Sequence, residues 1–278
     1  MGFGITTRVK NSLYSMRRKA LVPIDRIVTE DEALRGKTVL ISGGSGGIGM
    51  AIAKRLHASG ANIVLGGTNP DKLQKCVFEF GEGARVKTVV MDVASSEKAE
   101  MGILEATRQF GGVDVFVNSA GVHTEDVEFW NMTQGEFDRV LDINLRGAFF
   151  AGRAVAEHMI SEGTKGHILF VNSSRGFEPA WSPYGISKWG LRGMTQGFAQ
   201  MLLPYGIIVN GIAPGSTATP LIGVSEGDSI DTRENGVGRL SMPEEIAEWV
   251  RMLVGSSGDM VVGETILVSG GRGSIDIR

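Results

Sequence analysis

Two residues four positions apart, Tyr184 and Lys188, form a pair that could exchange a proton with a substrate. On a helix, this spacing places both side chains on one face. A free tyrosine has a pKa of about 10, which is too high for efficient proton exchange near neutrality. A lysine ammonium about 5 Å away, at an effective dielectric constant of about 20, favours the phenolate by roughly 3 kcal/mol. The pair therefore predicts a tyrosine pKa of about 7–8 and general acid–base catalysis.

Two more polar residues belong to the same hypothesis. The hydroxyl of Ser173 could polarise a carbonyl or an alcohol by a hydrogen bond, and Asn144 lies in a helical pattern. A Tyr-x-x-x-Lys pair alone is more often a solvated helix face, and a lone helical asparagine is more often a surface residue. The combination of these four residues with the glycine loop described next favours acid–base chemistry over those ordinary interpretations.

A glycine-rich segment, residues 42–49, would let the backbone approach a pyrophosphate closely. It follows a predicted strand and precedes a helical pattern at residues 50–58, which is the context that a dinucleotide site needs. Spacing alone fits two registers of the motif: Gly44, Gly46 and Gly49, or Gly43, Gly47 and Gly49. The alternative to a dinucleotide site is a glycine-rich turn that binds no ligand.

The end of the second predicted strand indicates which dinucleotide is bound. An acidic residue about 20 positions after the glycine loop would accept hydrogen bonds from the adenosine ribose and favour NAD. Residues 65–69 contain no acidic residue, and Thr68 stands among them. Asp71 follows Pro70 and fits the first turn of a helix instead. Residues 65–69 also contain no arginine that could bind a 2′-phosphate. Because no carboxylate stands there to repel that phosphate, we expect NADP(H), with NAD(H) as the alternative.

The elements that must position these residues alternate between strands and helices. Seven short segments rich in Val and Ile are typical of buried parallel strands: residues 37–42, 62–65, 86–91, 113–117, 167–172, 207–212 and 265–268. Helix starts are indicated at Thr133 and Ser241, each with a glutamate three positions later, and at Asn69 before Pro70. This order predicts an α/β fold, a doubly wound parallel sheet (Rossmann fold) with helices on both faces.

The composition is that of an ordinary folded protein. Of the 278 residues, 42% are hydrophobic and 21% are charged, which excludes disorder for the bulk of the chain. The net charge of -3 argues against nucleic-acid binding, and the four histidines lack metal-ligand spacing. Membrane contact is not expected, because no apolar run approaches the roughly 18 residues of a span. The single cysteine, Cys76, cannot form an internal disulfide, and no secretory signal pattern is present, so we expect a cytoplasmic protein.

The charge distribution separates an N-terminal arm from one large domain. Residues 1–20 hold five basic residues and no acidic one. Apolar residues recur there at helical steps: Ile5, Val9, Leu13, Met16 and Ala20. We interpret residues 1–35 as a basic arm and linker that packs on a neighbouring subunit, with a membrane-surface helix as the alternative. Residues 36–278 show no internal repeat or composition break and are predicted to form a single domain.

Three further motifs stand where predicted strands end. Residues 118–121 (Asn-Ser-Ala-Gly) follow the fourth strand, residues 184–188 (Tyr-Gly-Ile-Ser-Lys) start a helix after the fifth, and residues 214–219 (Pro-Gly-Ser-Thr-Ala-Thr) follow the sixth. In this order and spacing, residues 36–278 resemble the single-domain short-chain dehydrogenase/reductase family. The resemblance implies a Rossmann-fold oxidoreductase that depends on NAD(P) and forms a homo-oligomer, a homotetramer in the usual case.

The resemblance also implies roles for individual residues. Asn144 would hold a water molecule in a proton relay from Lys188, and Lys188 would also bind the nicotinamide ribose. The implied catalytic residues are Asn144, Ser173, Tyr184 and Lys188. The implied cofactor-binding residues include the second glycine register and comprise Gly43, Ser45, Gly47, Ile48, Gly49, Thr68, Asp92, Val93, Asn118, Ala120, Gly121, Tyr184, Lys188, Pro214, Gly215, Thr217 and Thr219.

One departure from the family concerns the loop before Tyr184. Ser173 precedes Tyr184 by 11 residues, slightly fewer than is usual in the family, and Ser174 stands next to it. We choose Ser173 as the catalytic serine because the strand pattern of residues 168–171 and Gly176 align it with the family position.

These observations predict an enzyme that transfers a hydride between NADP(H) or NAD(H) and a secondary alcohol or ketone. One alternative is an NAD(P)-binding redox sensor, although such proteins tend to lack the tyrosine or the lysine. Another is a sugar-nucleotide epimerase-like enzyme, which usually carries a longer C-terminal domain. The small-molecule substrate stays open among a sugar-like polyol, a hydroxysteroid and a 3-oxoacyl group.

Several residues beside the predicted site could contact that substrate. Residues 220–238 are expected to form a lid over the site, and His123 could line the substrate cleft. An apolar wall is expected from the segment before Tyr184, with Arg175 and Glu178 adding charge. The members of the apolar wall are Phe177, Pro179, Trp181 and Pro183.

Overall fold

The computed structural model describes residues 33–125, 128–225 and 227–275. The predicted arm therefore lies outside the described residues, except for residues 33–35. Within that short stretch, Leu34 is buried in the core and its N–H donates to the carbonyl oxygen of Ser59. The packed part of the chain thus includes Leu34.

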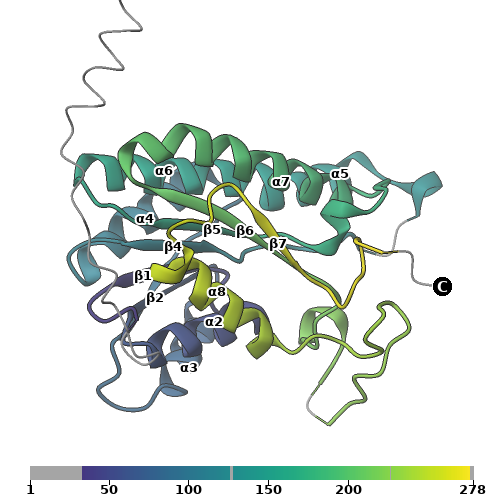
Figure 1. Cartoon of the computed structure of the whole chain (residues 1–278), viewed down its shortest axis with the longest axis horizontal. Helices are drawn as coiled ribbons and strands as arrows, with labels where there is room; N and C mark the ends of the chain where they lie inside the picture. The colour runs from purple at the N-terminus through teal and green to yellow at the C-terminus, as the bar shows by residue number, and fades with distance from the viewer. Residues whose placement is uncertain (1–32, 126–127, 226, 276–278) are drawn as a thin grey trace, which may run out of the picture.

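Seven parallel strands form one sheet in the order β3-β2-β1-β4-β5-β6-β7 (Figure 1). The strands are β1 (Thr38–Ser42), β2 (Asn62–Gly67), β3 (Val86–Val90), β4 (Val115–Asn118), β5 (His167–Val171), β6 (Ile208–Pro214) and β7 (Thr265–Val268). The predicted doubly wound parallel sheet is confirmed, and every predicted strand end lies within two residues of the observed one.

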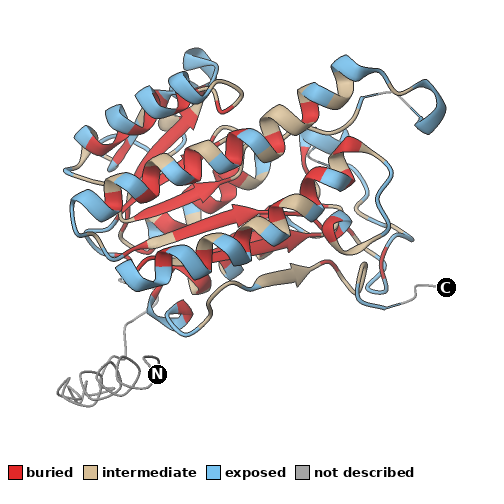
Figure 2. Ribbon diagram, turned by 90° about the horizontal axis from the view of Figure 1, so that it is seen from above, coloured by how far each residue is buried: buried red, intermediate tan, exposed pale blue. Residues whose placement is uncertain are grey.

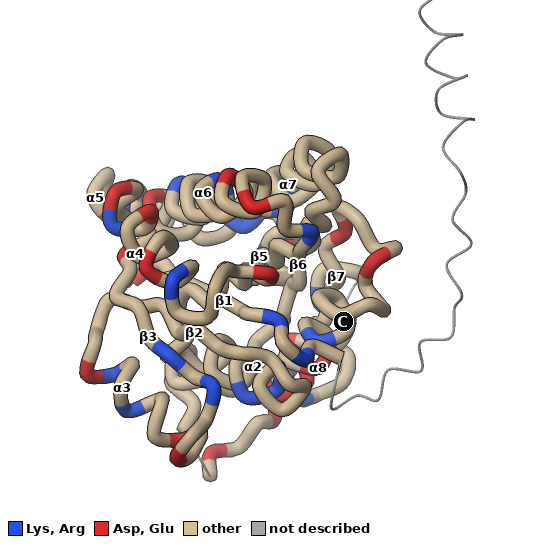
Figure 3. Tube along the Cα trace, turned by 90° about the vertical axis from the view of Figure 1, so that its left-hand side faces the viewer, with Lys and Arg blue, Asp and Glu red and all other residues tan. Residues whose placement is uncertain are grey.

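Helices cover both faces of the sheet, which Figure 3 shows between two helical layers. One layer holds α2 (Gly47–Ala58), α3 (Pro70–Phe78) and α8 (Pro243–Val254). The other layer holds α4 (Ser96–Gln109), α5 (Gln134–Leu141), α6 (Ala148–Ser161) and α7 (Pro183–Leu202). On the side seen in Figure 3, basic and acidic residues are interspersed along both layers rather than gathered by sign.

Each face of the sheet has its own hydrophobic core, because alternate side chains of a strand point to opposite faces. In β1, Val39 and Ile41 belong to the core under α2 and α8, whereas Leu40 belongs to the core under α4, α6 and α7. Figure 2 shows this burial along the strands and on the inner sides of the helices. Strands covered on both faces are hydrophobic at nearly every position, which explains why the sequence predicted them well.

The helix starts follow the predicted signals at two of three places. Asn69 caps α3 by accepting the N–H of Lys72, and Thr133 caps α5 by accepting the N–H of Glu136. At α5 the reciprocal half of the capping box is not formed, since the Glu136 carboxylate accepts from the N–H of Glu125 and pairs with Arg139.

The predicted cap of α8 at Ser241 is wrong by one residue. The cap is Met242, and the Glu245 carboxylate accepts its N–H at 2.8 Å. Ser241 instead pairs with Thr217 in an isolated parallel bridge, so its backbone is already committed to the neighbouring segment. Pro243 fits the first helical position, which fixes the start of α8 one residue later than predicted.

Candidate active site

Ser42 and Asn118 join the ends of β1 and β4, the neighbouring strands at which the order of the sheet reverses. The hydroxyl of Ser42 donates to Oδ1 of Asn118 at 2.8 Å, and the N–H of Ala120 donates to Ser42 Oγ at 3.4 Å. The glycine loop after β1 and residues 118–121 therefore lie against each other. In open α/β sheets, ligands bind at the carboxyl ends of the strands at such a reversal.

Three glycines of the loop leave no room for a side chain. Gly43 has a φ of +67°, and a Cβ there would lie 2.8 Å from Cα of Ala120. A Cβ on Gly49 would lie 2.3 Å from the carbonyl oxygen of Gly43, and one on Gly47 would lie 2.7 Å from Cγ2 of Thr219. These three glycines form the register that the family resemblance implies, and Gly44 of the other register is tightly packed as well, with its Cβ position 2.9 Å from Cδ2 of Leu65.

The N-terminus of α2 has the features of an anion site. Helix α2 begins at Gly47 without a side-chain cap and without an acidic residue in its first turn. By contrast, α3, α4, α5 and α7 are each capped by a side-chain oxygen, from Asn69, Ser95, Thr133 and Ser182. Free N–H groups and the helix dipole favour a negative charge at such an end. With the tightly packed glycines beside it, this end of α2 fits the pyrophosphate of a dinucleotide.

The predicted contacts to the adenosine half lie at the ends of β2 and β3. Thr68 is exposed directly after β2, and the Cβ position of Gly67 lies 3.7 Å from Ser45 Oγ in the glycine loop. Asp92 follows β3, and one of its carboxylate oxygens accepts the N–H of Ala94 at 3.0 Å, as in an ordinary turn. A phosphate on the ribose would thus meet a hydroxyl-bearing residue, not a carboxylate, directly after β2.

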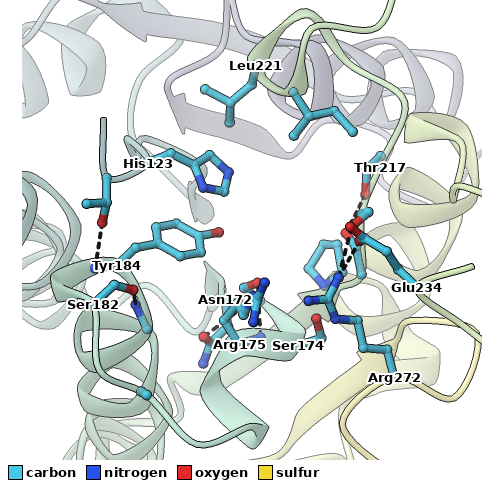
Figure 4. Close-up of a pocket in the computed structure, with 18 of the residues that line it drawn as sticks. His123, Asn172, Ser174, Arg175, Ser182, Tyr184, Thr217, Leu221, Glu234 and Arg272 are labelled. Atoms are coloured by element: carbon cyan, nitrogen blue, oxygen red, sulfur yellow. Dashed lines mark hydrogen bonds and ion pairs between the residues drawn. The ribbon is translucent and has the colours of Figure 1, made fainter. Parts of the chain in front are cut away.

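Tyr184 lies in the first turn of α7, which Ser182 caps. Its phenol points into a pocket (Figure 4) and is hydrogen-bonded to Ser173. Ser173 is itself buried, and its Oγ accepts the N–H of Arg175 at 3.2 Å. The imidazole of His123 stacks on the Tyr184 ring, with 4.1 Å between the ring centroids and 25° between the planes. Stacking and the hydrogen bond together restrict the position of the phenol.

Burial raises the pKa of Tyr184, while the hydrogen bond with Ser173 and the charges of Arg175 and Arg272 act in the opposite direction. The predicted lowering to about 7–8 by Lys188 is therefore wrong for the protein alone. The ammonium of Lys188 lies 5.5 Å from the centroid of the Tyr184 ring. The loss of solvation of the phenolate outweighs the hydrogen bond and the two arginine charges.

Lys188 lies one helical turn after Tyr184 and is buried, with 5% of its surface exposed. Its Nζ donates to the carbonyl oxygen of Val171 at 3.0 Å, and the Cβ position of Gly121 lies 3.8 Å from Nζ. Burial lowers the pKa of Lys188 to about 8. The ammonium can donate three hydrogen bonds, so donors remain for hydroxyl groups placed beside residues 118–121.

Asn144 lies in a π-helical segment, Asp142–Gly147, that joins α5 to α6. Its Oδ1 accepts the N–H of Val122 at 2.8 Å, and its Nδ2 donates to the carbonyl oxygen of Val122 and to Ser187 Oγ. The amide thus holds the loop after β4 against α7. π-bulges are frequent at functional sites. The predicted proton relay through Asn144 stays a prediction.

The pocket beside Tyr184 has a volume of about 370 Å³. Seven predicted site residues line it: Ile48, Ser173, Tyr184, Pro214, Gly215, Thr217 and Thr219. The other predicted residues do not line it; they lie at or after the ends of strands, in the first turn of α2, in the π-helical segment or on α7: Gly43, Ser45, Gly47, Gly49, Thr68, Asp92, Val93, Asn118, Ala120, Gly121, Asn144 and Lys188.

A group of charged and hydroxyl side chains lines part of the pocket, and Figure 4 shows Glu234 and Arg272 across the pocket from Tyr184. We call it the polar wall: Arg175, Ser216, Glu234 and Arg272 line the pocket, and Glu178 does not line it but pairs with both arginines. Arg272 joins three loops, because its Nε donates to Glu178 at 2.7 Å and its Nη1 pairs with Glu234 and Ser216. Arg175 donates to the second oxygen of Glu178 at 3.0 Å. Sequence reasoning missed Ser216, Glu234 and Arg272.

The apolar side of the pocket differs in part from the prediction. Pro179 and Trp181 line it as predicted, and Leu221 and Ile222 come from the expected lid segment. Phe177 and Pro183 do not line it. The guanidinium of Arg192 lies over the ring of Phe177, with 4.0 Å between its Cζ and the ring centroid. Pro183 is buried in the first turn of α7.

The described part of the chain shows neither a metal site nor a membrane-spanning helix. Residues 33–125, 128–225 and 227–275 contain no group of three or more His, Cys, Asp or Glu side chains arranged to hold a metal ion. Among the same residues, no helix has the length and apolar character required to cross a membrane.

Comparison with known proteins gives a consistent picture. A family model described as short chain dehydrogenase matches residues 37–228. A 3-oxoacyl-[acyl-carrier-protein] reductase of Rickettsia bellii is 33% identical over 243 residues, which cover 86% of this chain and 97% of the relative.

Solved structures agree with this similarity. A gluconate 5-dehydrogenase of Burkholderia cenocepacia in complex with NADP and tartrate has a TM-score of 0.81 and 30% identity, with 88% of this chain and 99% of that chain covered. A variant of actinorhodin polyketide ketoreductase with NADPH has a TM-score of 0.79 and 28% identity, with 86% and 98% covered.

Proposed function

The chain belongs to the short-chain dehydrogenase/reductase family and is a nicotinamide-dependent oxidoreductase acting on alcohol or ketone groups, and we propose that Tyr184 is its acid–base residue. The observation that carries the proposal is the phenol of Tyr184, which points into the pocket while hydrogen-bonded to Ser173. Ser173 would hold the oxygen of the substrate beside the phenol. Tyr184 would give a proton to that oxygen in reduction and remove one in oxidation.

The neighbouring residues support this chemistry in separate ways. A bound nicotinamide supplies or accepts the hydride. Lys188 would bind the nicotinamide ribose and stabilise the phenolate through its charge, which also offsets part of the desolvation of Tyr184. Asn144 would hold the loop of Val122 against α7 and so fix the position of Lys188.

We propose NADP(H) as the preferred cofactor, with NAD(H) as the alternative. Support comes from Thr68, which is exposed directly after β2 where a carboxylate would repel a 2′-phosphate. Two structural relatives are described with NADP or NADPH. The glycine loop would hold the pyrophosphate, and residues 118–121 the adenosine side.

The polar wall favours a small polar substrate, such as a sugar-like polyol, over a hydroxysteroid. It presents both hydrogen-bond donors and acceptors to the pocket, and desolvating them against an apolar ring would cost free energy. A gluconate 5-dehydrogenase is among the structural relatives. A panel of polyols, hydroxysteroids and 3-oxoacyl compounds, each assayed with both cofactors, tests this preference.

The next proposal concerns the cellular compartment and the oligomeric state of the protein. We propose a cytoplasmic homotetramer. Cys76 is a free, buried thiol, which suits a reducing compartment.

Substitution Tyr184→Phe tests the acid–base role. It keeps the ring and its stacking on His123 but removes the proton donor, so kcat should fall about 10²–10⁴-fold with little change in cofactor affinity. Steady-state kinetics and NADPH fluorescence titration measure the two quantities. A variant that keeps more than about a tenth of kcat on a chemistry-limited substrate would exclude Tyr184 as the acid–base residue.

Substitution Thr68→Asp tests the cofactor preference. A carboxylate directly after β2 should repel a 2′-phosphate and accept from ribose hydroxyls, so the ratio of kcat/KM for NADPH to that for NADH should fall at least about tenfold. Thr68→Ser serves as the control and should leave the ratio nearly unchanged. A wild-type enzyme that already favours NADH tenfold would overturn the proposal.

A further inference from the structure

Asn172 carries a buried donor that does not find an acceptor among the described residues. It follows β5 and directly precedes Ser173, and only 3% of its surface is exposed. Its Nδ2 is buried and makes no hydrogen bond within the described part of the chain. Yet Asn172 lines the pocket beside Tyr184 (Figure 4). An unpaired amide donor is costly in a protein interior, so one carried by a residue that lines a pocket points to a ligand.

The orientation of this amide is fixed by its other atom. Oδ1 of Asn172 accepts the N–H of Ser173 at 2.9 Å. A Cβ on Gly176 would lie 3.0 Å from the same oxygen, so the loop after Ser173 packs closely against it. The backbone N–H of Asn172 donates to the carbonyl oxygen of Ile212 in β6 and holds the main chain in the sheet. With Oδ1 engaged, Nδ2 must point away from the N–H of Ser173.

A second buried asparagine provides the contrast. Asn210 in β6 is 2% exposed, and both atoms of its amide are paired. Its Nδ2 donates to the carbonyl oxygen of Val261, and its Oδ1 accepts the N–H of Glu264. Asn210 thus stabilises the fold with both atoms, whereas Asn172 uses only its oxygen.

We propose that Nδ2 of Asn172 binds an uncharged oxygen of the ligand in this pocket, either the carboxamide oxygen of the nicotinamide or a carbonyl or hydroxyl oxygen of the substrate. The position is compatible with both sources. Asn172 directly precedes Ser173 and is bonded through its backbone N–H to Ile212 of β6, the strand that leads to Pro214 and Gly215 at the pocket. The amide N–H can donate to a carbonyl or hydroxyl oxygen, and it carries no charge that would favour an ionised acceptor. The inference rests on the proposed oxidoreductase function and adds a specificity-determining residue to it.

Binding measurements on Asn172→Ala and Asn210→Ala test the proposal. For Asn172→Ala, either the Kd of NADPH, from fluorescence titration without substrate, or the KM of the substrate at saturating NADPH should rise about 5–30-fold. A change in Kd identifies the cofactor as the source, and a change in KM alone identifies the substrate. Asn210→Ala should leave both constants unchanged.

Thermal unfolding adds a readout that does not depend on turnover. The Tm of the ligand-free protein should fall less for Asn172→Ala than for Asn210→Ala, because only Asn210 loses two paired atoms. The rise in Tm on adding the affected ligand should shrink only for Asn172→Ala. A larger loss of Tm for ligand-free Asn172→Ala, with an undiminished rise on ligand addition, would assign Asn172 a purely structural role.

The variant Asn172→Asp separates the donor from the acceptor. Above neutral pH, an ionised aspartate keeps an oxygen for the N–H of Ser173 but cannot donate, so it should bind the ligand at least as weakly as Asn172→Ala. Wild-type affinities in Asn172→Asp would overturn the proposal, because the contact with Ser173 alone would then suffice. A wild-type protein that binds NADPH and NADH but turns over no alcohol or ketone would instead contradict the proposed acid–base chemistry and leave the cofactor measurement valid.

Discussion

At the scale of single residues, Lys188 combines a structural cost with a proposed function. Its ammonium is buried and donates to the carbonyl oxygen of Val171. A main-chain carbonyl offsets the desolvation of an ammonium less well than a carboxylate does, which explains why burial lowers the pKa of Lys188 to about 8. This cost fits the proposed role, because a carboxylate at this place would neutralise the charge that Tyr184 and the ribose need.

The pH dependence of stability tests this environment of Lys188. In the unfolded chain the lysine has an ordinary pKa of about 10.5, so between pH 8 and 10.5 the unfolded state binds more protons than the folded state. The free energy of unfolding of the wild type should therefore rise with pH across this window, by up to about 3 kcal/mol relative to Lys188→Met. Urea unfolding of both proteins at several pH values measures the difference. Parallel pH profiles would contradict a buried, charged Lys188.

The sequence predicted the local pairs of the site better than its long-range partners. Tyr184 and Lys188 share one helix, so their spacing alone places them on one face. Arg272 and Glu178 meet across the molecule, 94 residues apart in the chain. Both lie in irregular loops, where hydrophobic periodicity gives no signal. Their contact therefore could not be predicted from spacing.

At the scale of elements, the polar wall connects segments that leave three different strands. Glu178 follows β5, Ser216 follows β6, and Arg272 follows β7, while Glu234 comes from the loop before α8. Arg272 is 15% exposed in its side chain, so its ion pairs are shielded more than those of a surface arginine. The loops around the pocket are thus held together by one guanidinium.

Substitution Arg272→Gln tests this connection. Glu178 and Glu234 would lose a shielded partner, so the free energy of unfolding should fall by about 2–3 kcal/mol, and the KM of a polar substrate should rise. Arg239→Gln is the matched control: Arg239 pairs with Glu245 by two hydrogen bonds on the surface, where solvent screens the charges. Urea unfolding and steady-state kinetics compare the two. Equal effects of both variants would show that Arg272 has no special role at the pocket.

The helix starts show which sequence patterns predict an element boundary correctly and which do not. Asn69 before Pro70 predicted the start of α3 correctly, because cap and first-turn residues are neighbours in the chain. Ser241 had the same local signal, but a bridge to Thr217, 24 residues earlier, removed it from the cap position. A local signal can thus fail to predict the start of an element where a distant segment pairs with the same backbone groups.

At the scale of the whole molecule, α6 and α7 expose apolar side chains on the side away from the sheet. Phe149 is 41% exposed and lines a surface hollow together with Leu145 and Met194. On α7, Gly193 and Gly197 lie four residues apart with nothing within 4 Å of their Cβ positions. An apolar hollow beside two exposed glycine positions of α7 would let a helix of a second copy approach closely. This surface supports the proposed homo-oligomer.

Light scattering coupled to size-exclusion chromatography tests the oligomer. A tetramer should have a mass of about 119 kDa, four times the 29.7 kDa of the chain. Replacing Phe149 and Gly197 by glutamate would place charges on the proposed contact and should lower the mass without unfolding the domain. The control Phe78→Glu changes an exposed phenylalanine of α3, on the opposite helical layer, and should keep the wild-type mass. A wild-type mass of about 30 kDa at micromolar concentration would exclude the oligomer, because the apolar surface would then face water in the working protein.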